Sequence, residues 1–133
     1  MQTCYFCHLA QTKEDIRIIE DDKFFADWDP APVSKGHAFV SPKNHIESFF
    51  EAKPEEIKNI FEFILKVKKI IEAKYHPDGY NIGINDGRAA DRSIDHLHIH
   101  IIPRYTGDVE NPKGGVRNIL GTKVEPKPQP KKF

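Results

Sequence analysis

Three histidines alternate with aliphatic residues in the C-terminal half of the sequence. They are His96, His98 and His100. Side chains of a β-strand point to opposite faces with a period of two, so these imidazoles share one face, each roughly 6.6 Å from the next. The intervening positions, expected to face a core, are Leu97, Ile99 and Ile101. A merely solvated face would carry Lys, Thr or Glu, so the pattern favours chemistry over a purely structural role.

Two kinds of chemistry fit this pattern. In one, the three imidazoles chelate a catalytic metal, since imidazole is a common zinc ligand and alternate strand positions can converge on one ion. In the other, one imidazole is a nucleophile and its neighbours stabilise charge. A histidine, with a reference pKa of about 6.5, is substantially neutral at pH 7 and can attack phosphorus. Water can then release the labile phosphoramidate.

The two cysteines of the sequence, Cys4 and Cys7, form a Cys-x-x-Cys pair. In a secreted protein of this length a single pair would be a thin disulfide framework. In a reducing compartment the same spacing is typical of metal or redox chemistry. No thioredoxin-like βαβ pattern surrounds the pair, so metal binding is favoured. We therefore expect a cytoplasmic protein.

Short β-prone segments accompany the histidine strand. Residues 16–20 and 24–28 flank a polar turn and predict a hairpin. The histidine strand is expected over 94–102, ended by Pro103, because proline cannot donate to a ladder. The remaining extended segments are 37–41, closed by Pro42, and 80–85.

A long amphipathic helix is expected to begin near Pro54. Proline suits a first helical position, and Glu55 and Glu56 favour the positive end of the helix dipole. The apolar stripe at spacings of three and four consists of Ile57, Ile60, Phe61, Ile64, Val67 and Ile71. One long helix among several short strands, without regular βαβ alternation, predicts an antiparallel α+β domain.

The composition excludes several classes of protein. The chain has 133 residues, with 20 Lys plus Arg and 20 Asp plus Glu. A zero net charge argues against binding to nucleic acid or to a membrane surface, and no apolar run approaches the roughly 18 residues of a membrane span. We expect one domain over residues 1–120. Residues 121–133, with three prolines and four lysines, form a tail that buries little.

The histidine segment 96–102 resembles the signature of the histidine triad (HIT) family of nucleotide hydrolases and transferases. The resemblance covers about residues 4–105 and includes further positions in the expected order. These are Cys4, Cys7, Phe25 to Asp27, Pro30, Gly36, His37, Pro42, Lys43, His45, Asn85 and Ser93. It implies a HIT-like α+β fold with an antiparallel sheet of about five strands and one long helix. It also implies a homodimer with a continuous sheet.

The resemblance implies a role for each matching residue. His98 would attack the α-phosphorus of a nucleotide, with His100 and His37 stabilising charge on the phosphate oxygens. Ser93 would hydrogen-bond the phosphate or the leaving atom, and Asn85 would position the phosphate. The nucleotide itself would be bound by Asp27 at the ribose hydroxyls and by aromatic walls around the base: Phe25, Trp28 and either Phe6 or Leu9.

In the subset of the family with an N-terminal Cys-x-x-Cys, the resemblance implies a structural zinc and no catalytic cofactor. Its ligands would be Cys4, Cys7, His45 and His96, a closed set of two thiolates and two imidazoles. His8 is an alternative to His45.

The sequence departs from the family at one loop. Family members commonly have Gly-Gln before the serine, whereas this chain has Asp91 and Arg92 before Ser93. Arg92 could hold phosphate bidentately or be a solvated surface arginine. A further basic edge, Arg104 to Asp108 and Gly114 to Arg117, could hold outer phosphates of a long substrate.

Three functions remain open from the sequence. The resemblance implies hydrolysis of dinucleoside polyphosphates or nucleoside phosphoramidates at the α-phosphate, through a nucleotidyl-histidine, releasing a nucleoside monophosphate. The alternatives are a metal-dependent hydrolase that uses the three strand histidines as ligands, and a nucleotide sensor with little turnover.

Overall fold

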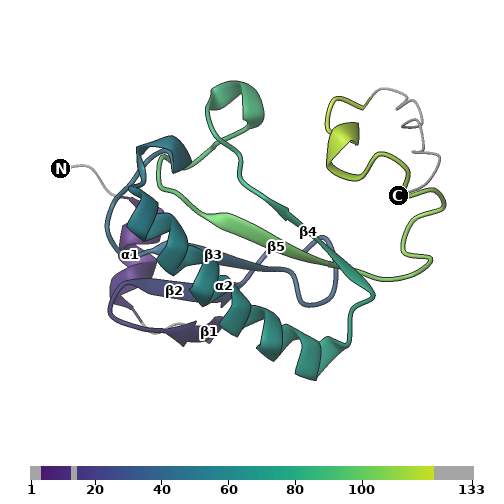
Figure 1. The fold of residues 1–133 in the computed structure, drawn as a ribbon, viewed down its shortest axis with the longest axis horizontal. Helices are drawn as coiled ribbons and strands as arrows, with labels where there is room; N and C mark the ends of the chain where they lie inside the picture. Colours follow the sequence, from purple (N-terminus) through teal and green to yellow (C-terminus); the bar gives the residue numbers. More distant parts are fainter. Residues whose placement is uncertain (1–3, 13–14, 122–133) are drawn as a thin grey trace, which may run out of the picture.

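A computed structural model describes residues 4–12 and 15–121. Five antiparallel strands form one sheet in the order β1-β2-β3-β5-β4, as Figure 1 shows. The strands are β1 (Arg17–Glu20), β2 (Phe24–Trp28), β3 (Ala38–Pro42), β4 (Gly79–Gly83) and β5 (Ile99–Arg104). The helices are α1 (Tyr5–Gln11) and α2 (Pro54–Tyr75), with short 3₁₀ turns η1 (Phe49–Glu51), η2 (Arg88–Ala90) and η3 (Gly115–Asn118). The predicted α+β class, hairpin and long helix are confirmed.

Helix α2 covers one face of the sheet (Figure 1). Its first turn is closed by the Lys53 N–H, which donates to the Glu56 carboxylate at 3.0 Å. The helix residues buried against the sheet are Ile60, Phe63, Val67 and Ile71. The predicted stripe is wrong at Phe61, which is 60% exposed, while Phe63 is buried in its place. The buried face of α2 is therefore narrower than the full set of its apolar residues.

Alternation along the strands separates two cores. Phe24 and Ala26 of β2 pack with α2, whereas Phe25 packs with Phe6 and Leu9 of α1. The aliphatic residues of the histidine segment, Leu97, Ile99 and Ile101, all join the α2 core. The opposite face, where the histidines lie, therefore belongs to α1. No helix was predicted from the sequence for the residues of α1.

The histidine strand differs from its predicted bounds. Strand β5 begins at Ile99, so His96, in a bend, and His98 both precede it. The Leu97 N–H there donates to the Ile46 carbonyl at 2.6 Å. The strand also continues through Pro103, which pairs with Tyr80 of β4 and lies beyond the last β3–β5 pair. Proline is tolerated because no β3 residue is opposite it there.

The predicted tail, apart from Gly121, lies outside the described residues. Within residues 4–12 and 15–121, no helix has both the length and the apolar character needed to cross a membrane.

Candidate functional site

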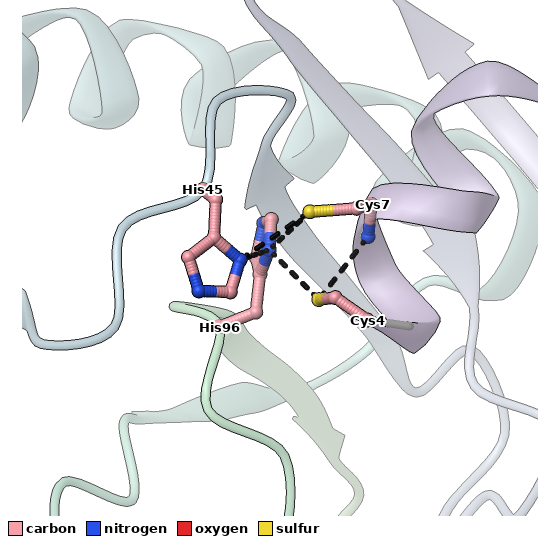
Figure 2. Close-up of side chains that lie close together, drawn as sticks. All are labelled: Cys4, Cys7, His45 and His96. Atoms are coloured by element: carbon pink, nitrogen blue, oxygen red, sulfur yellow. Dashed lines mark hydrogen bonds between the residues drawn. The ribbon is translucent and has the colours of Figure 1, made fainter. Parts of the chain in front are cut away.

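The predicted zinc ligands form one cluster at the junction of α1 with the histidine segment (Figure 2). The His96 Nδ1 atom lies 3.3 Å from Cys4 Sγ, 3.4 Å from Cys7 Sγ and 3.3 Å from His45 Nδ1. The Cys7 Sγ and His45 Nδ1 atoms are 3.3 Å apart. Ligands around a tetrahedral zinc, with bonds of about 2.0–2.3 Å, are separated by about 3.3–3.7 Å. His8 is exposed and does not belong to the cluster.

The tautomer of His96 is set by its second nitrogen. Its Nε2 atom lies 2.8 Å from the Pro42 carbonyl oxygen, which can only accept, so Nε2 carries the proton and Nδ1 presents its lone pair to the cysteines. Burial, and after it the hydrogen bond and charge of the neighbouring Cys4, raise the pKa of the Cys7 thiol to about 11. A cation is therefore what would keep both sulfurs ionised. The four residues fit a structural zinc in donor type, spacing and proton placement.

The same logic assigns the tautomer of His98. Its Nδ1 atom lies 2.8 Å from the His96 carbonyl oxygen, so Nδ1 carries the proton and Nε2 retains a lone pair. Burial lowers the pKa of His98, which keeps the ring neutral at pH 7. The ring stacks on Phe6 with centroids 4.4 Å apart and meets Phe39 edge-on at 6.4 Å. His98 is thus a neutral imidazole held by packing, with a lone pair on Nε2.

His37 and His100 form a directional pair beside the His98 ring. The Val33 N–H donates to His37 Nδ1 at 3.1 Å, so the proton of neutral His37 sits on Nε2. That Nε2–H donates to His100 Nδ1 at 3.0 Å, so the N–H of neutral His100 is on its Nε2. Burial lowers the pKa of both rings. The pair presents a polar donor without a net charge.

The carboxylate of Asp29 faces the His37–His100 pair, and no role was predicted for it from the sequence. Its Oδ2 atom is 3.4 Å from His37 Nε2 and 3.6 Å from His100 Nδ1. Asp29 directly follows Trp28, the last residue of β2. An acidic residue immediately after a strand end was the available signal, and it was overlooked in favour of Asp27.

The cluster of Asp29, His37 and His100 is compact enough to hold a metal ion. The hydrogen bond from Val33 opposes this use. A metal at His37 Nε2 would place the imidazole proton on Nδ1, where it would face the Val33 N–H. Nor do His96, His98 and His100 form one ligand set among the residues that the structure describes. The geometry therefore favours one metal cluster and a separate metal-free histidine site.

The sequence pattern of the HIT domain family matches residues 10–107. This protein belongs to the HIT domain family. An uncharacterized HIT-like protein of Methanocaldococcus jannaschii is 42% identical over 120 residues, which cover 87% of this chain and 91% of the relative. The adenosine 5'-monophosphoramidase hnt1 of Schizosaccharomyces pombe is 39% identical over 105 residues, covering 77% of this chain and 74% of hnt1.

A solved HIT structure supports the metal assignment. The zinc-bound histidine triad family protein of Mycobacterium smegmatis matches with a TM-score of 0.73 at 33% identity, over 82% of this chain and 80% of that one. The HIT-like fold expected from the sequence is confirmed. The cluster of Cys4, Cys7, His45 and His96 is the candidate zinc site of this HIT protein.

Asp27 of this HIT protein lies in the middle of the sheet, opposite Phe39 of β3. It is fully buried, and its carboxylate pairs with the Arg17 guanidinium of β1, which lies opposite it in the hairpin. The Arg17 guanidinium also lies 4.7 Å from the centroid of the Phe25 ring. A carboxylate enclosed in this way holds β1 to β2, and Asp29 is the acidic group that faces the histidines.

The predicted base-pocket aromatics lie on both sides of the sheet. Trp28 packs edge-on against Tyr75 of α2, on the face away from the histidines. Phe25 is fully buried behind Phe39. The aromatic rings that touch His98 are Phe6 and Phe39, of which only Phe6 was named from the sequence, as an alternative.

Of the remaining predicted residues, one lies in a pocket that His37 and His100 also line. Asn85 lines this pocket, about 410 Å³ in volume, together with Ile82 of β4 and Val116 of η3. Ser93 is exposed in the loop after η2. Arg92 donates to the carboxylates of Asp86 and Asp95 and to the Glu47 carbonyl. Arg104 is paired bidentately with Asp108 at 2.8 and 2.9 Å.

Proposed function

We propose that this HIT protein is a nucleotide hydrolase that cleaves at the α-phosphate through a covalent nucleotidyl-histidine on His98. The observation that carries the proposal is the hydrogen bond from His98 Nδ1 to the His96 carbonyl, which leaves a lone pair on Nε2 of a neutral ring. A relative named as an adenosine 5'-monophosphoramidase supports the same reaction class.

In the first step, the His98 Nε2 lone pair attacks the α-phosphorus and a P–N bond forms. The bond from phosphorus to the leaving group breaks, and that group departs with the electron pair as a phosphate, or as an amine that takes up a proton from solvent. The Nε2–H of His100 is the available hydrogen-bond donor for a phosphate oxygen or the departing atom. In the second step, water attacks the same phosphorus and loses one proton to solvent, the P–N bond breaks with its electron pair returning to His98 Nε2, and the nucleoside monophosphate leaves.

The nucleotide-binding roles follow the geometry. We assign the ribose hydroxyls to Asp29, because its carboxylate faces the histidines and can accept two donors. We assign a wall of the base pocket to the Phe6 and Phe39 rings beside His98. Asn85 and Ser93 remain the proposed amide and hydroxyl partners of the phosphate.

The zinc has a structural role in this proposal. It would be held by Cys4, Cys7, His45 and His96 and would supply a fixed crosslink between α1, the His45 loop and the histidine segment. A thiolate pair of this kind persists in a reducing compartment, and we assign the protein to the cytoplasm on that ground.

Trapping of the intermediate tests the proposal. The protein is mixed with AMP-lysine phosphoramidate or diadenosine polyphosphate labelled at the α-phosphate, quenched in alkali and digested. We expect label on the peptide containing His98, and none with His98→Ala, whose kcat/KM falls by at least about 10³-fold. Binding without label would instead indicate a sensor. Turnover without label that ends on metal removal would indicate a metal-dependent hydrolase.

The substrate class within this reaction is decided by a panel. Initial rates are compared for a lysyl-AMP phosphoramidate, a dinucleoside polyphosphate and a nucleotide sugar. The monophosphoramidase relative leads us to expect the highest kcat/KM for the phosphoramidate.

We also propose that two copies pair through β4. This strand lies at the edge of the sheet, and its Ile82 is 52% exposed. An edge strand with an exposed aliphatic side chain is a template for pairing with a second strand. Light scattering is expected to give twice the chain mass of 15.3 kDa, and Ile82→Lys to return the monomer.

A further inference from the structure

Arg92 lies at the centre of a polar network that joins two loops distant in sequence. Its Nε donates to Asp95 Oδ1 at 3.2 Å, and its Nη1 donates to Asp86 Oδ1 at 3.2 Å and to the Glu47 carbonyl at 3.1 Å. The Arg92 side chain is only 17% exposed, against 71% for Arg88 on the same loop. These bonds use the Nε–H and both N–H groups of Nη1, so the guanidinium is anchored by groups of the protein itself.

The partners of Arg92 are themselves fixed. The Ser48 hydroxyl donates to the second oxygen of Asp86 at 3.0 Å, so Asp86 bridges Ser48 and Arg92. Arg88 donates to the Arg92 carbonyl at 2.7 Å and to Asp95 Oδ2 at 2.8 Å. Backbone bonds from the amides of residues 90–92 to Gly87 and Arg88 close the turn between them. The loop is a closed ring of charge-assisted hydrogen bonds.

The hydrogen-bond network around Arg92 lies between the candidate zinc site and the pocket lined by His37, His100 and Asn85. On one side, Glu47 and Ser48 follow His45, a ligand of the candidate zinc site. On the other, Asp86 follows Asn85, which lines the pocket beside His37 and His100, and Arg92 precedes Ser93. The Arg92 guanidinium (the Arg92 fork) thus hydrogen-bonds both to the loop that follows His45 and to the loop that follows Asn85.

From this network we infer that Arg92 is a positioning residue, which holds Asn85 and Ser93 in place through Asp86 and the adjoining backbone, and does not contact phosphate. The inference rests on the proposed hydrolase function. It predicts that a loss of the fork disturbs the chemical step equally for short and long substrates, because the lost contacts are within the protein. A phosphate contact would instead weaken binding more as phosphates are added.

The first test does not depend on activity. Amide hydrogen exchange is measured by mass spectrometry in the full-length protein, in Arg92→Lys and in Arg104→Lys as the matched control, because Arg104 also forms directed bonds to a carboxylate, that of Asp108, outside this loop. Lysine keeps the charge but has one ammonium nitrogen in place of the planar guanidinium, so it cannot reproduce the bonds that Nε and Nη1 make to Asp95, Asp86 and the Glu47 carbonyl. We expect exchange over residues 86–95 to be at least about tenfold faster in Arg92→Lys, and to stay near the wild-type rate in Arg104→Lys. Unchanged exchange in Arg92→Lys overturns the inference.

The second test is kinetic. Arg92→Lys and Asp86→Asn are each expected to lower kcat by about 10- to 100-fold, with KM within threefold of the wild type. The loss should be the same on an AMP phosphoramidate as on diadenosine tri- and tetraphosphate. A loss that grows with the number of phosphates overturns the inference and assigns Arg92 to the substrate. If the wild type turns over none of these nucleotides, the proposed function fails, and the exchange result still decides whether Arg92 fixes the loop.

Discussion

The ring of Phe6 is stacked on the ring of His98, with centroids 4.4 Å apart and planes inclined by 23°. Phe6 lies between Cys4 and Cys7, so the metal ligands and the packing partner of the candidate nucleophile share one turn of α1. This helix has seven residues, too few to be stable in isolation. One short helix therefore contributes both ligands to the candidate zinc site and a packing partner to His98, the candidate nucleophile.

Removal of the metal is expected to loosen this connection. Cys4→Ser, or prolonged dialysis against a chelator, should remove one zinc per chain and lower the stability by about 3 kcal/mol, which corresponds to roughly 10 °C in Tm. Metal analysis and calorimetry provide the measurement. His8→Ser, at an exposed position of the same helix, is the control and should retain the zinc. A zinc content that survives loss of both cysteines would contradict the assignment of the ligands.

Shortening the Phe6 ring is expected to reduce turnover without loss of zinc. Phe6→Leu removes the stacked surface beside His98 and should lower kcat by about tenfold at a cost of about 1–2 kcal/mol in stability. Phe63→Leu is a matched control, because Phe63 is equally buried but lies in the α2 core. Equal losses of kcat in the two variants would show that general destabilisation is the cause.

Asp29 and Asp27 are expected to separate binding from stability. Asp29→Asn should raise KM by about tenfold and abolish any preference of the wild type for ribose over 2'-deoxyribose substrates, because its carboxylate faces the histidine pair. Asp27→Asn should leave that preference intact and destabilise the fold by about 3 kcal/mol, since it leaves Arg17 beside a neutral group in a buried position. Substrate panels and urea unfolding measure the two effects. The reverse outcome would return the ribose role to Asp27.

The His37–His100 pair sets an expected pH dependence. Burial lowers the pKa of both rings, while Asp29 raises both and His98 lowers that of His100. Protonation would make His100 Nδ1 a donor and break its bond from His37, so activity requires the neutral pair. We expect kcat/KM to stay level from pH 8 to about 6.5 and to fall only below that value. Asp29→Asn should move this acid limb to still lower pH; a shift to higher pH would contradict the assignment.

The local patterns of the sequence determined much of the fold. Alternation of His96, His98 and His100 with aliphatic residues correctly separated the two faces of the segment, because side-chain direction in an extended chain follows from backbone geometry alone. The α2 start at Pro54 was predicted from capping and dipole preferences, which act within one turn. The chemistry of two thiols and two imidazoles, together with the family resemblance, also predicted the metal cluster.

Other features were decided only by tertiary structure. Asp27 and Asp29 are two residues apart but have different partners. Asp27 pairs with Arg17 across the hairpin, whereas Asp29 follows the end of β2 and faces the histidine pair. Phe61 and Phe63 are distinguished by which side of α2 packs against the sheet. The role of Arg92 depends on Glu47, which is 45 positions away in sequence. Such outcomes follow from which distant groups meet, and contacts of that kind leave no trace in local periodicity or composition.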